Sequence, residues 1–417
     1  MRKLYFSIVV VLLFASPLFS QQVDLSAELR PRFEYKNGYK SLLKIGEEGA
    51  SFISQRTRLN LNYKQDNFKV RIVLQNVRVW GDVSTLSASD NSNAFHEAWA
   101  QFSVANNFDL KLGRQEIIYD DSRIFGNVGW AQQARSHDAI IAKIKTSENG
   151  KLDIGFALNS DSQAGIKNIY SNVAGYKTFQ YLWYHTQMNN FGVSFLALNN
   201  GIEFADVNND PKVNYSQTFG PRIAYKKDKL SFNAATYLQT GKILANSVST
   251  SYFAVNGSFK ATSEFNIGVG FEYLSGKDTN DASTDVKSFN PIFGTNHKFN
   301  GWMDYFYVGN HANSVGLMDF NATIIYKKDK FSAKLVPHLF KSAADIYNGA
   351  TKMNSNLGTE LDFTIGYKIA NNIQFNAGHS QMFGTSSLKA LKGGEHTKNN
   401  SWTWLMLTFK PTFYASN

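Results

Sequence analysis

The sequence of 417 residues has no cysteine, only 7 prolines and, after its first twenty residues, no long apolar run. The lack of cysteine excludes disulfides, thiolate metal sites and a lipid-modified cysteine behind a signal sequence. Without a run of about 20 apolar residues, no later segment can span a bilayer as a helix. Because prolines are few and glycines are spread out, no linker divides the chain, and we expect residues 21–417 to form one domain.

The first twenty residues have the features of a secretory signal peptide. Arg2 and Lys3 precede an apolar stretch from about Leu4 to Phe14, which is followed by small residues. We expect cleavage after Ser20, so residues 1–20 are the signal peptide and the protein is exported.

What the chain has in abundance is aromatic residues, 33 Phe and 20 Tyr, which favour strands over helices. The mature chain opens on "VDLSAELRPRFEY", residues 23–35, where apolar and polar residues alternate without a break apart from a proline. Successive side chains of a strand point to opposite faces, so one face of this segment is apolar and the other is densely charged.

This alternation recurs in eighteen segments joined by short and long connections in strict alternation, with the longest loops near 116–137 and 275–315. An even strand number with short turns at one end and long loops at the other is the layout of an outer-membrane barrel. We therefore predict an all-β fold, an 18-stranded antiparallel transmembrane β-barrel. The predicted strands are roughly 23–35, 51–63, 68–80, 94–104, 108–115, 138–145, 151–159, 178–186, 191–198, 217–226, 230–240, 251–260, 265–274, 316–326, 331–339, 356–367, 373–382 and 401–413.

The alternative is a soluble β-sandwich or repeat array with its apolar face turned inward. A single closed sheet of this strand number is too wide for side chains to fill its interior. Conversely, Arg or Lys facing the bilayer midplane costs roughly 2–4 kcal/mol. We therefore expect apolar residues against lipid, charged residues around a watery lumen, and a place in the outer membrane of a Gram-negative cell. The lipid bilayer is then a partner and nucleic acid is not.

Arginine is unevenly distributed, because nine of the eleven arginines lie between positions 30 and 135. The planar guanidinium grips carboxylate or phosphate through two bonds, and rings of basic side chains favour anions. Acidic residues on the same strand faces allow a second interpretation, a lattice of ion pairs that stiffens the wall. Strand alternation, with a local irregularity at Gln75 and Asn76, assigns these arginines to the lumen: Arg30, Arg32, Arg56, Arg58, Arg71 and Arg78.

One stretch resembles a known family. Residues 112–139, "LGRQEIIYDDSRIFGNVGWAQQARSHDA", are similar to a segment of the alginate-export family of outer-membrane proteins, and residues 289–311 resemble a loop of its members. The resemblance implies an 18-stranded barrel whose arginine-bearing lumen passes an anionic uronate polysaccharide outward. It also implies that Arg114, Arg123, Arg135 and Asp138 line the mouth or constriction.

Two features depart from that family. Its best-understood exporters have a long periplasmic plug loop, whereas the short turns expected here have about three to five residues, so the family's gating mechanism does not carry over. The terminal aromatic residue of the last strand is Phe413 or Tyr414 rather than the final residue.

Other functions have weaker support. His297 with Asp304, or His137 with Ser136 and Asp138, could be drawn as acid/base pairs, but no established catalytic spacing surrounds them, so we expect neither an enzyme nor a cofactor. The acidic loop 275–285 leaves open a site for a cation with oxygen ligands. Among transporters, a polysaccharide exporter served by periplasmic export machinery competes with a general or anion-biased porin for small anions. A surface-binding barrel with a plugged lumen is a third alternative.

Overall fold

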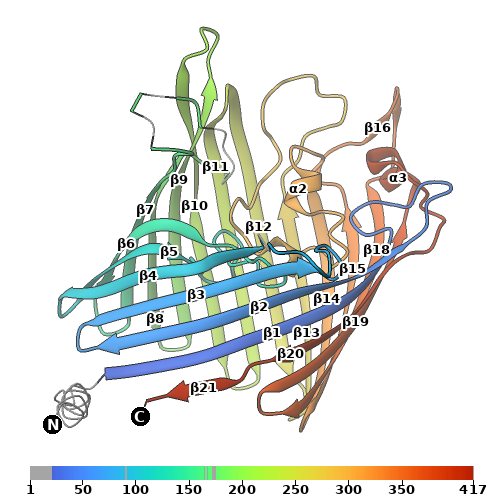
Figure 1. Cartoon of the computed structure of the whole chain (residues 1–417). Helices are drawn as coiled ribbons and strands as arrows, with labels where there is room; N and C mark the ends of the chain where they lie inside the picture. The colour runs from blue at the N-terminus through green and yellow to red at the C-terminus, as the bar shows by residue number, and fades with distance from the viewer. Residues whose placement is uncertain (1–20, 90–91, 164, 167, 171–174, 417) are drawn as a thin grey trace, which may run out of the picture.

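The computed structural model describes residues 21–89, 92–163, 165–166, 168–170 and 175–416, which form one closed antiparallel barrel (Figure 1). The predicted signal peptide lies outside the described residues. The wall consists of β1 (Gln21–Asn37), β2 (Ala50–Gln65), β3 (Phe68–Val79), β4 (Asn93–Ala105), β5 (Phe108–Gln115), β6 (His137–Lys145), β7 (Gly150–Leu158), β8 (Thr178–Met188), β9 (Phe191–Ala205), β10 (Pro211–Lys227), β11 (Leu230–Ile243), β12 (Asn246–Lys260), β13 (Phe265–Leu274), β14 (Leu317–Lys328), β15 (Phe331–Lys341), β18 (Asn356–Ala370), β19 (Ile373–Gly384), β20 (Asn400–Phe409) and β21 (Thr412–Ala415).

Strands β20 and β21 both pair with β1, so they are two parts of the last strand and the barrel has eighteen strands, as predicted. Strand β1 pairs with β2 on its other side, which closes the sheet. The remaining elements lie in loops: η1 (Asn296–Lys298), α2 (Val308–His311), α3 (Ser386–Lys392), and a hairpin of β16 (Tyr347–Asn348) and β17 (Thr351–Lys352).

The two faces of β1 differ as the alternation predicts. Leu29 and Phe33 point outward with exposed fractions of 38% and 36%, whereas Arg30 between them is only 8% exposed. The charged face points into the barrel, and it is buried there because loops cover it, as the contacts below show. Apolar residues face the lipid, where a charge would be costly.

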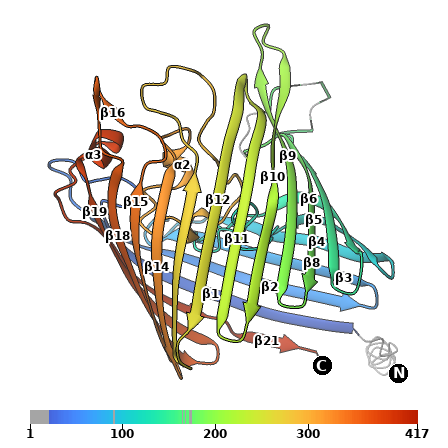
Figure 2. The same cartoon turned by 180° about the vertical axis from the view of Figure 1, so that it is seen from behind.

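All connections at the end that holds both termini are tight turns (Figures 1 and 2). They have two to four residues, from 66–67 to 371–372. Asp66, Asn189, Asp228 and Asp329 adopt positive φ angles in these turns, the backbone that two-residue hairpins need and that Asp and Asn tolerate. No turn among them is long enough to form a plug.

The opposite end carries nine connections, but two of the nine are not the long loops that we predicted. Residues 206–210 and 244–245 are short because β9 to β12 continue well past the apolar belt (Figure 2). Polar residues such as Asn199 and Glu203 stand at positions that continue the lipid-facing set of Phe191 and Phe195, so the alternation that marked the strands fades before the backbone pairing ends.

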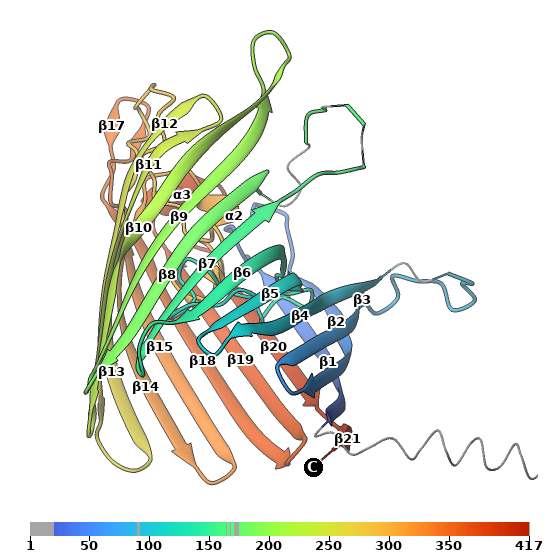
Figure 3. The same cartoon turned by 90° about the vertical axis from the view of Figure 1, so that its left-hand side faces the viewer.

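The wall is lowest at β5, β6 and β7, which have 8, 9 and 9 residues, against 17 in β10 (Figure 3). These short strands barely reach the roughly 9–11 residues that a tilted strand needs to span a bilayer. Loop 116–136 leaves from this low rim. Within the described part of the chain, no helix is long and apolar enough to cross a membrane.

Candidate functional site

Two of the upper loops fold into the barrel and pair with each other. Loop 116–136 meets loop 275–316 through a parallel bridge between Phe125 and Phe293. The N–H of Gly126 donates to the carbonyl of Phe293 at 2.9 Å, and the N–H of Thr295 donates to that of Ser122 at 2.9 Å. These two loops, called the constriction module below, lie within the ring of strands in both opposing views (Figures 1 and 2).

Three predicted lumen arginines hold one side of the module. Arg30 donates to the carbonyl of Gly129 at 2.9 Å and to Oε1 of Gln132 at 2.9 Å. Arg32 donates to the carbonyl of Trp130 at 2.7 Å, and Arg56 forms an ion pair of 2.5 Å with Glu28 while reaching toward the same loop. All three side chains are nearly buried. Their charges therefore bind groups of the wall and of the loop and do not contact a solute in the lumen.

Four carboxylates of the wall hold the opposite side of the module. On β18, Glu360 accepts the N–H of Met303 at 2.8 Å and Asp362 accepts that of Trp302 at 3.1 Å. Asn300 of the loop donates to Glu272 at 2.8 Å and to Asp319 at 3.2 Å. Arginines therefore bind the module through its carbonyls, and carboxylates bind it through its N–H groups.

Arg123 connects the module to this acidic wall. Its guanidinium is 2% exposed and donates to Glu272 at 3.0 Å and to Asn300 at 2.9 Å. Burial lowers the pKa of Arg123 but the Glu272 carboxylate raises it further, so that its pKa stays above the ordinary value. Arg123 lies at the constriction that the family resemblance implied, as an anchor of the loop.

Arg58 and Arg71 lie further toward the turns and are only partly buried. Arg58 donates to Gln75 Oε1 at 2.8 Å through Nε, while its Nη2 has no partner. Arg71 forms an ion pair of 2.6 Å with Glu97. Both point inward, because Arg58 shares a face with Arg56, and Arg71 shares one with Val73 and Gln75.

Two lysines extend this row, and the sequence reasoning missed them. Lys111 on β5 lies 4.0 Å from the ring centroid of Trp99, and Lys143 on β6 contacts Asp153. The alternation in "FDLKLGRQ" already puts Lys111 opposite the lipid-facing Leu112, so a lysine search on strand faces would have found it. The luminal ladder, as we name it, consists of Arg58, Arg71, Lys111 and Lys143 on β2, β3, β5 and β6.

The ladder runs toward the end with the turns. A cavity of about 480 Å³ beside it is lined by Lys143, Tyr119, Trp183 and the turn residues Asn106 and Asn107. Trp183 is stacked between Tyr119, with ring centroids 4.4 Å apart, and His185, 5.6 Å away. This cavity lies on the periplasmic side of the module.

Arg78 lines a cavity of about 470 Å³ with Arg32, Glu34 and Trp130, but the register lacks the irregularity on which its predicted luminal position rested. Strands β2 and β3 pair in continuous register from Gln65 opposite Phe68 to Ser54 opposite Val79, without the irregularity that the prediction needed. Arg78 therefore shares a side of β3 with Leu74 and Asn76 at the upper rim. The irregularity exists on the other edge of β3, where its pairing with β4 shifts.

Arg114 and Asp138 lie at the low rim of the wall. They pair directly across β5 and β6 and form an ion pair of 3.1 Å, with side-chain exposed fractions of 45% and 59%. They share a side with the exposed Leu112 and Ile140, so Asp138 lies on the outer side of the rim, whereas Arg114 also lines a cavity of about 720 Å³ beside Arg135.

Arg135, the remaining predicted site residue, lies on the extracellular side of the module. Its Nη1 donates to the carbonyl of Gly294 at 3.0 Å. Burial lowers the pKa of Arg135, and the nearby Tyr307 and Tyr176 oppose that effect only in part.

The pairs that could have suggested catalysis have structural roles. His297 contacts Asp304 at 2.8 Å and stacks on Trp130, with ring centroids 5.1 Å apart. His137 points inward while its neighbour Asp138 points outward. Among the described residues, no group of three or more His, Cys, Asp or Glu could hold a metal ion. In the acidic loop 275–285, Asp281 pairs with Lys287 at 2.7 Å.

A closed barrel with an apolar outer face, tight turns at one end and loops folded into a charged lumen defines an outer-membrane channel embedded in the lipid bilayer. The model of the alginate export family matches residues 21–390, and the chain belongs to this family. It is thus a transport protein and not an enzyme. The search of curated proteins found no match.

Solved channel structures share the fold at low sequence identity. Pseudomonas aeruginosa OccK3 (OpdO) aligns with a TM-score of 0.63 and 12% identity, covering 94% of this chain and 96% of that chain. The outer-membrane protein opdK from Pseudomonas aeruginosa gives 0.62 and 10%, covering 94% and 99%. Acinetobacter baumannii OccAB1 gives 0.62 and 10%, covering 94% and 97%.

Proposed function

We propose that this channel passes carboxylate-bearing saccharides, of the uronate type, outward along the luminal ladder. The observation that carries the proposal is the row of four cations on β2, β3, β5 and β6, below a module that narrows the lumen. Arginine and lysine rings favour anions in pores, and guanidinium groups fit carboxylates. The membership in the alginate export family supports both the substrate class and the outward direction.

Charge pairing divides the ladder into two kinds of cation. Arg71 and Lys143 have carboxylate partners, Glu97 and Asp153. Arg58 and Lys111 have no carboxylate within ion-pair distance among the described residues. A paired cation contributes little net field, so the proposal assigns the attraction of solute to Arg58 and Lys111, and bracing to the other two.

The proposal is tested by single-channel current in a planar bilayer. An oligouronate added on the side of the turns should block the current in discrete events, whereas a neutral oligosaccharide of equal length should not. Equal block by both, or none by either, would contradict the proposal. The polymer must be delivered to the turn side, so periplasmic export machinery is the protein partner that the proposal requires.

A general, anion-biased porin is the second candidate. It is favoured by the turns, which have only two to four residues and provide no periplasmic plug. An ohmic, weakly selective current that ignores the oligouronate would support this candidate.

A further inference from the structure

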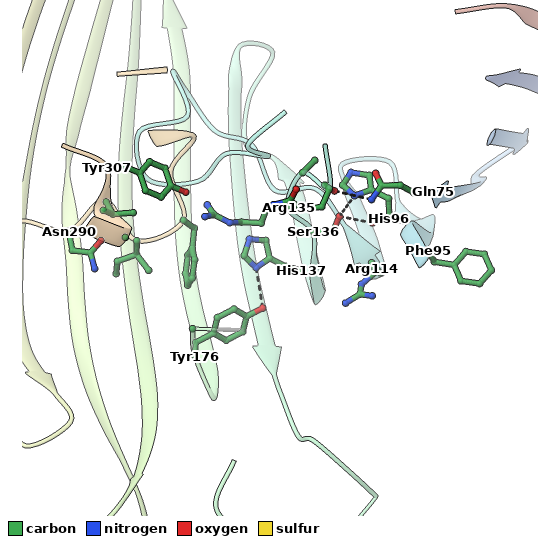
Figure 4. Close-up of a pocket in the computed structure, with 17 residues that line it drawn as sticks. Gln75, Phe95, His96, Arg114, Arg135, Ser136, His137, Tyr176, Asn290 and Tyr307 are labelled. Atoms are coloured by element: carbon green, nitrogen blue, oxygen red, sulfur yellow. Dashed lines mark hydrogen bonds between the residues drawn. The ribbon is translucent and has the colours of Figure 1, made fainter. Parts of the chain in front are cut away.

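A second cavity lies on the other side of the module from the turns. It has a volume of about 720 Å³, within the range of about 300–1,000 Å³ that is common for small-molecule sites. Figure 4 shows Arg135 extending across it toward Tyr307, and His137 bonded to Tyr176. Gln75 lines this cavity and also accepts the hydrogen bond of Arg58, so the cavity stands directly above the ladder.

The cavity is basic and has no acidic lining. Its 17 lining residues include Arg114 and Arg135 but no Asp or Glu. The charge of Arg114 is met by Asp138 outside the cavity. The two other large polar cavities differ, since each includes at least three carboxylate side chains: Glu34, Asp82 and Asp304 in one, and Asp109, Glu148 and Asp153 in the other.

Of the two arginines that line this cavity, Arg135 is the one without a counter-charge among the described residues. Arg56, Arg71 and Arg123 each contact a carboxylate, whereas no described Asp or Glu lies within ion-pair distance of Arg135. Its one hydrogen bond, to the carbonyl of Gly294, leaves most of the guanidinium fork unused. A largely buried charge is normally paired, so the structure lacks one anion at this point.

Polar groups around Arg135 suit a sugar. Gln133, Ser136 and Tyr307 line the cavity with amide and hydroxyl groups. Two more lining residues have an unpartnered buried atom, Nε2 of His137 and Oδ1 of Asn290. Such atoms are usually satisfied in folded proteins, and a hydroxylated ligand can satisfy them after small side-chain rotations.

We propose that Arg135 anchors a separate binding site for one carboxylate-bearing sugar residue on the extracellular side of the module. The carboxylate pairs with the unused nitrogens of the guanidinium, and the ring hydroxyls bond to the surrounding amides and hydroxyls. The choice of a uronate over another small anion rests on the proposed function. The need for an anion rests on Arg135 alone. A uronate polymer would then contact two binding sites, the luminal ladder below the module and Arg135 above it.

Calorimetry on the detergent-solubilised mature barrel tests this site. Galacturonate is titrated, with galactose as the neutral sugar. We expect saturable binding of galacturonate only. Loss of a hydrogen-bonded charge should weaken it about ten-fold or more in Arg135→Gln, while Arg135→Lys keeps part of the affinity. Arg78→Gln is the matched control, because Arg78 is not among the residues that line this cavity.

Three results would overturn the proposal: no binding to the wild-type barrel, equal binding of galactose, or unchanged affinity in a folded Arg135→Gln. Circular dichroism establishes whether each variant folds. If Arg135→Gln does not fold, the affinity of Arg135→Lys is measured instead, and an affinity equal to that of the wild type would contradict the proposal. The assay requires no flux. A channel that fails the oligouronate test but binds galacturonate through Arg135 would therefore remove the proposed function and leave this site standing.

Discussion

Arg32 and Trp130 join the wall to the constriction loop through two contacts at once. The guanidinium carbon lies 4.1 Å from the centroid of the Trp130 ring, and Nη1 donates to the Trp130 carbonyl at 2.7 Å. Arg32 of the strand thus contacts both the backbone carbonyl and the aromatic face of Trp130 in the loop. Because Arg30 and Arg56 reach the same loop segment, its position is fixed by buried charge rather than by apolar packing alone.

Replacing Arg56 with methionine should destabilise the barrel strongly. Glu28 would lose its buried partner, and leaving a buried charge uncompensated costs about 3–5 kcal/mol. Lys410 contacts the same carboxylate at 3.6 Å, but its side chain is 65% exposed, so Lys410→Met should cost under about 1 kcal/mol. Urea unfolding in lipid measures both. Equal losses of the free energy of unfolding in the two variants would show that the buried Arg56–Glu28 pair contributes no more than the exposed Lys410–Glu28 pair.

Gly301→Ala should loosen the module. Gly301 has φ of +81°, and a Cβ there would lie 2.7 Å from Oε2 of Glu360. The loop must then move away from β18, so the single-channel current should become larger and noisier. Gly46→Ala is the matched control, because Gly46 has φ of +83° with nothing within 4 Å. It carries the same backbone strain without the clash. The interpretation fails if both variants alter the current equally.

The lack of cysteine allows a direct test of which side chains face the lumen. Arg58→Cys should react with a small charged thiol reagent and lose conductance, because its side chain borders the conducting path. Asp138→Cys should react without a change in conductance, since its side chain is 59% exposed and shares a side with the lipid-facing Ile140. Loss of current at Asp138→Cys would place this residue in the lumen, as the family resemblance implied.

The stability of the α3 region should depend on pH. Burial lowers the pKa of Lys392 to about 8, from about 10.4 for a free lysine. Between these values the unfolded state binds more protons, so the free energy of unfolding rises as pH increases from about 8 to 10.4 and is flat below pH 8. Thermal unfolding at pH 7.5 and pH 10 measures the rise. Lys392→Met should remove this rise in stability. A rise that persists in the variant would show that another group causes it.

Alternation along the strands carried enough information to predict the barrel, its strand number and the faces of Arg30, Arg32, Arg56, Arg58 and Arg71. Alternation alone does not describe the rim. Arg78 and Arg114 each line a cavity there, although the register puts Arg78 on the side of Leu74 and Arg114 on the side of Leu112.

The module could not be predicted in the same way. Arg30 pairs with Gln132, which is 102 residues away, and Arg123 pairs with Glu272, which is 149 residues away. No periodic pattern records such contacts, because the loops lack strand alternation and their partners are backbone carbonyls and N–H groups. For the same reason the sequence left two roles for the arginines open. The structure places bracing contacts on the upper arginines and leaves Arg58 unpaired.

The most direct test of the account is the reversal potential of single channels in a salt gradient. The wild-type barrel should prefer anions, and Arg58→Gln with Lys111→Gln should move the reversal potential toward zero, because these ladder cations have no carboxylate partner among the described residues. Lys44→Gln with Lys352→Gln removes the same number of charges from the upper loops, where these side chains are 74% and 60% exposed, and should leave it unchanged. An equal shift in both double variants, or none in the first, would contradict the account.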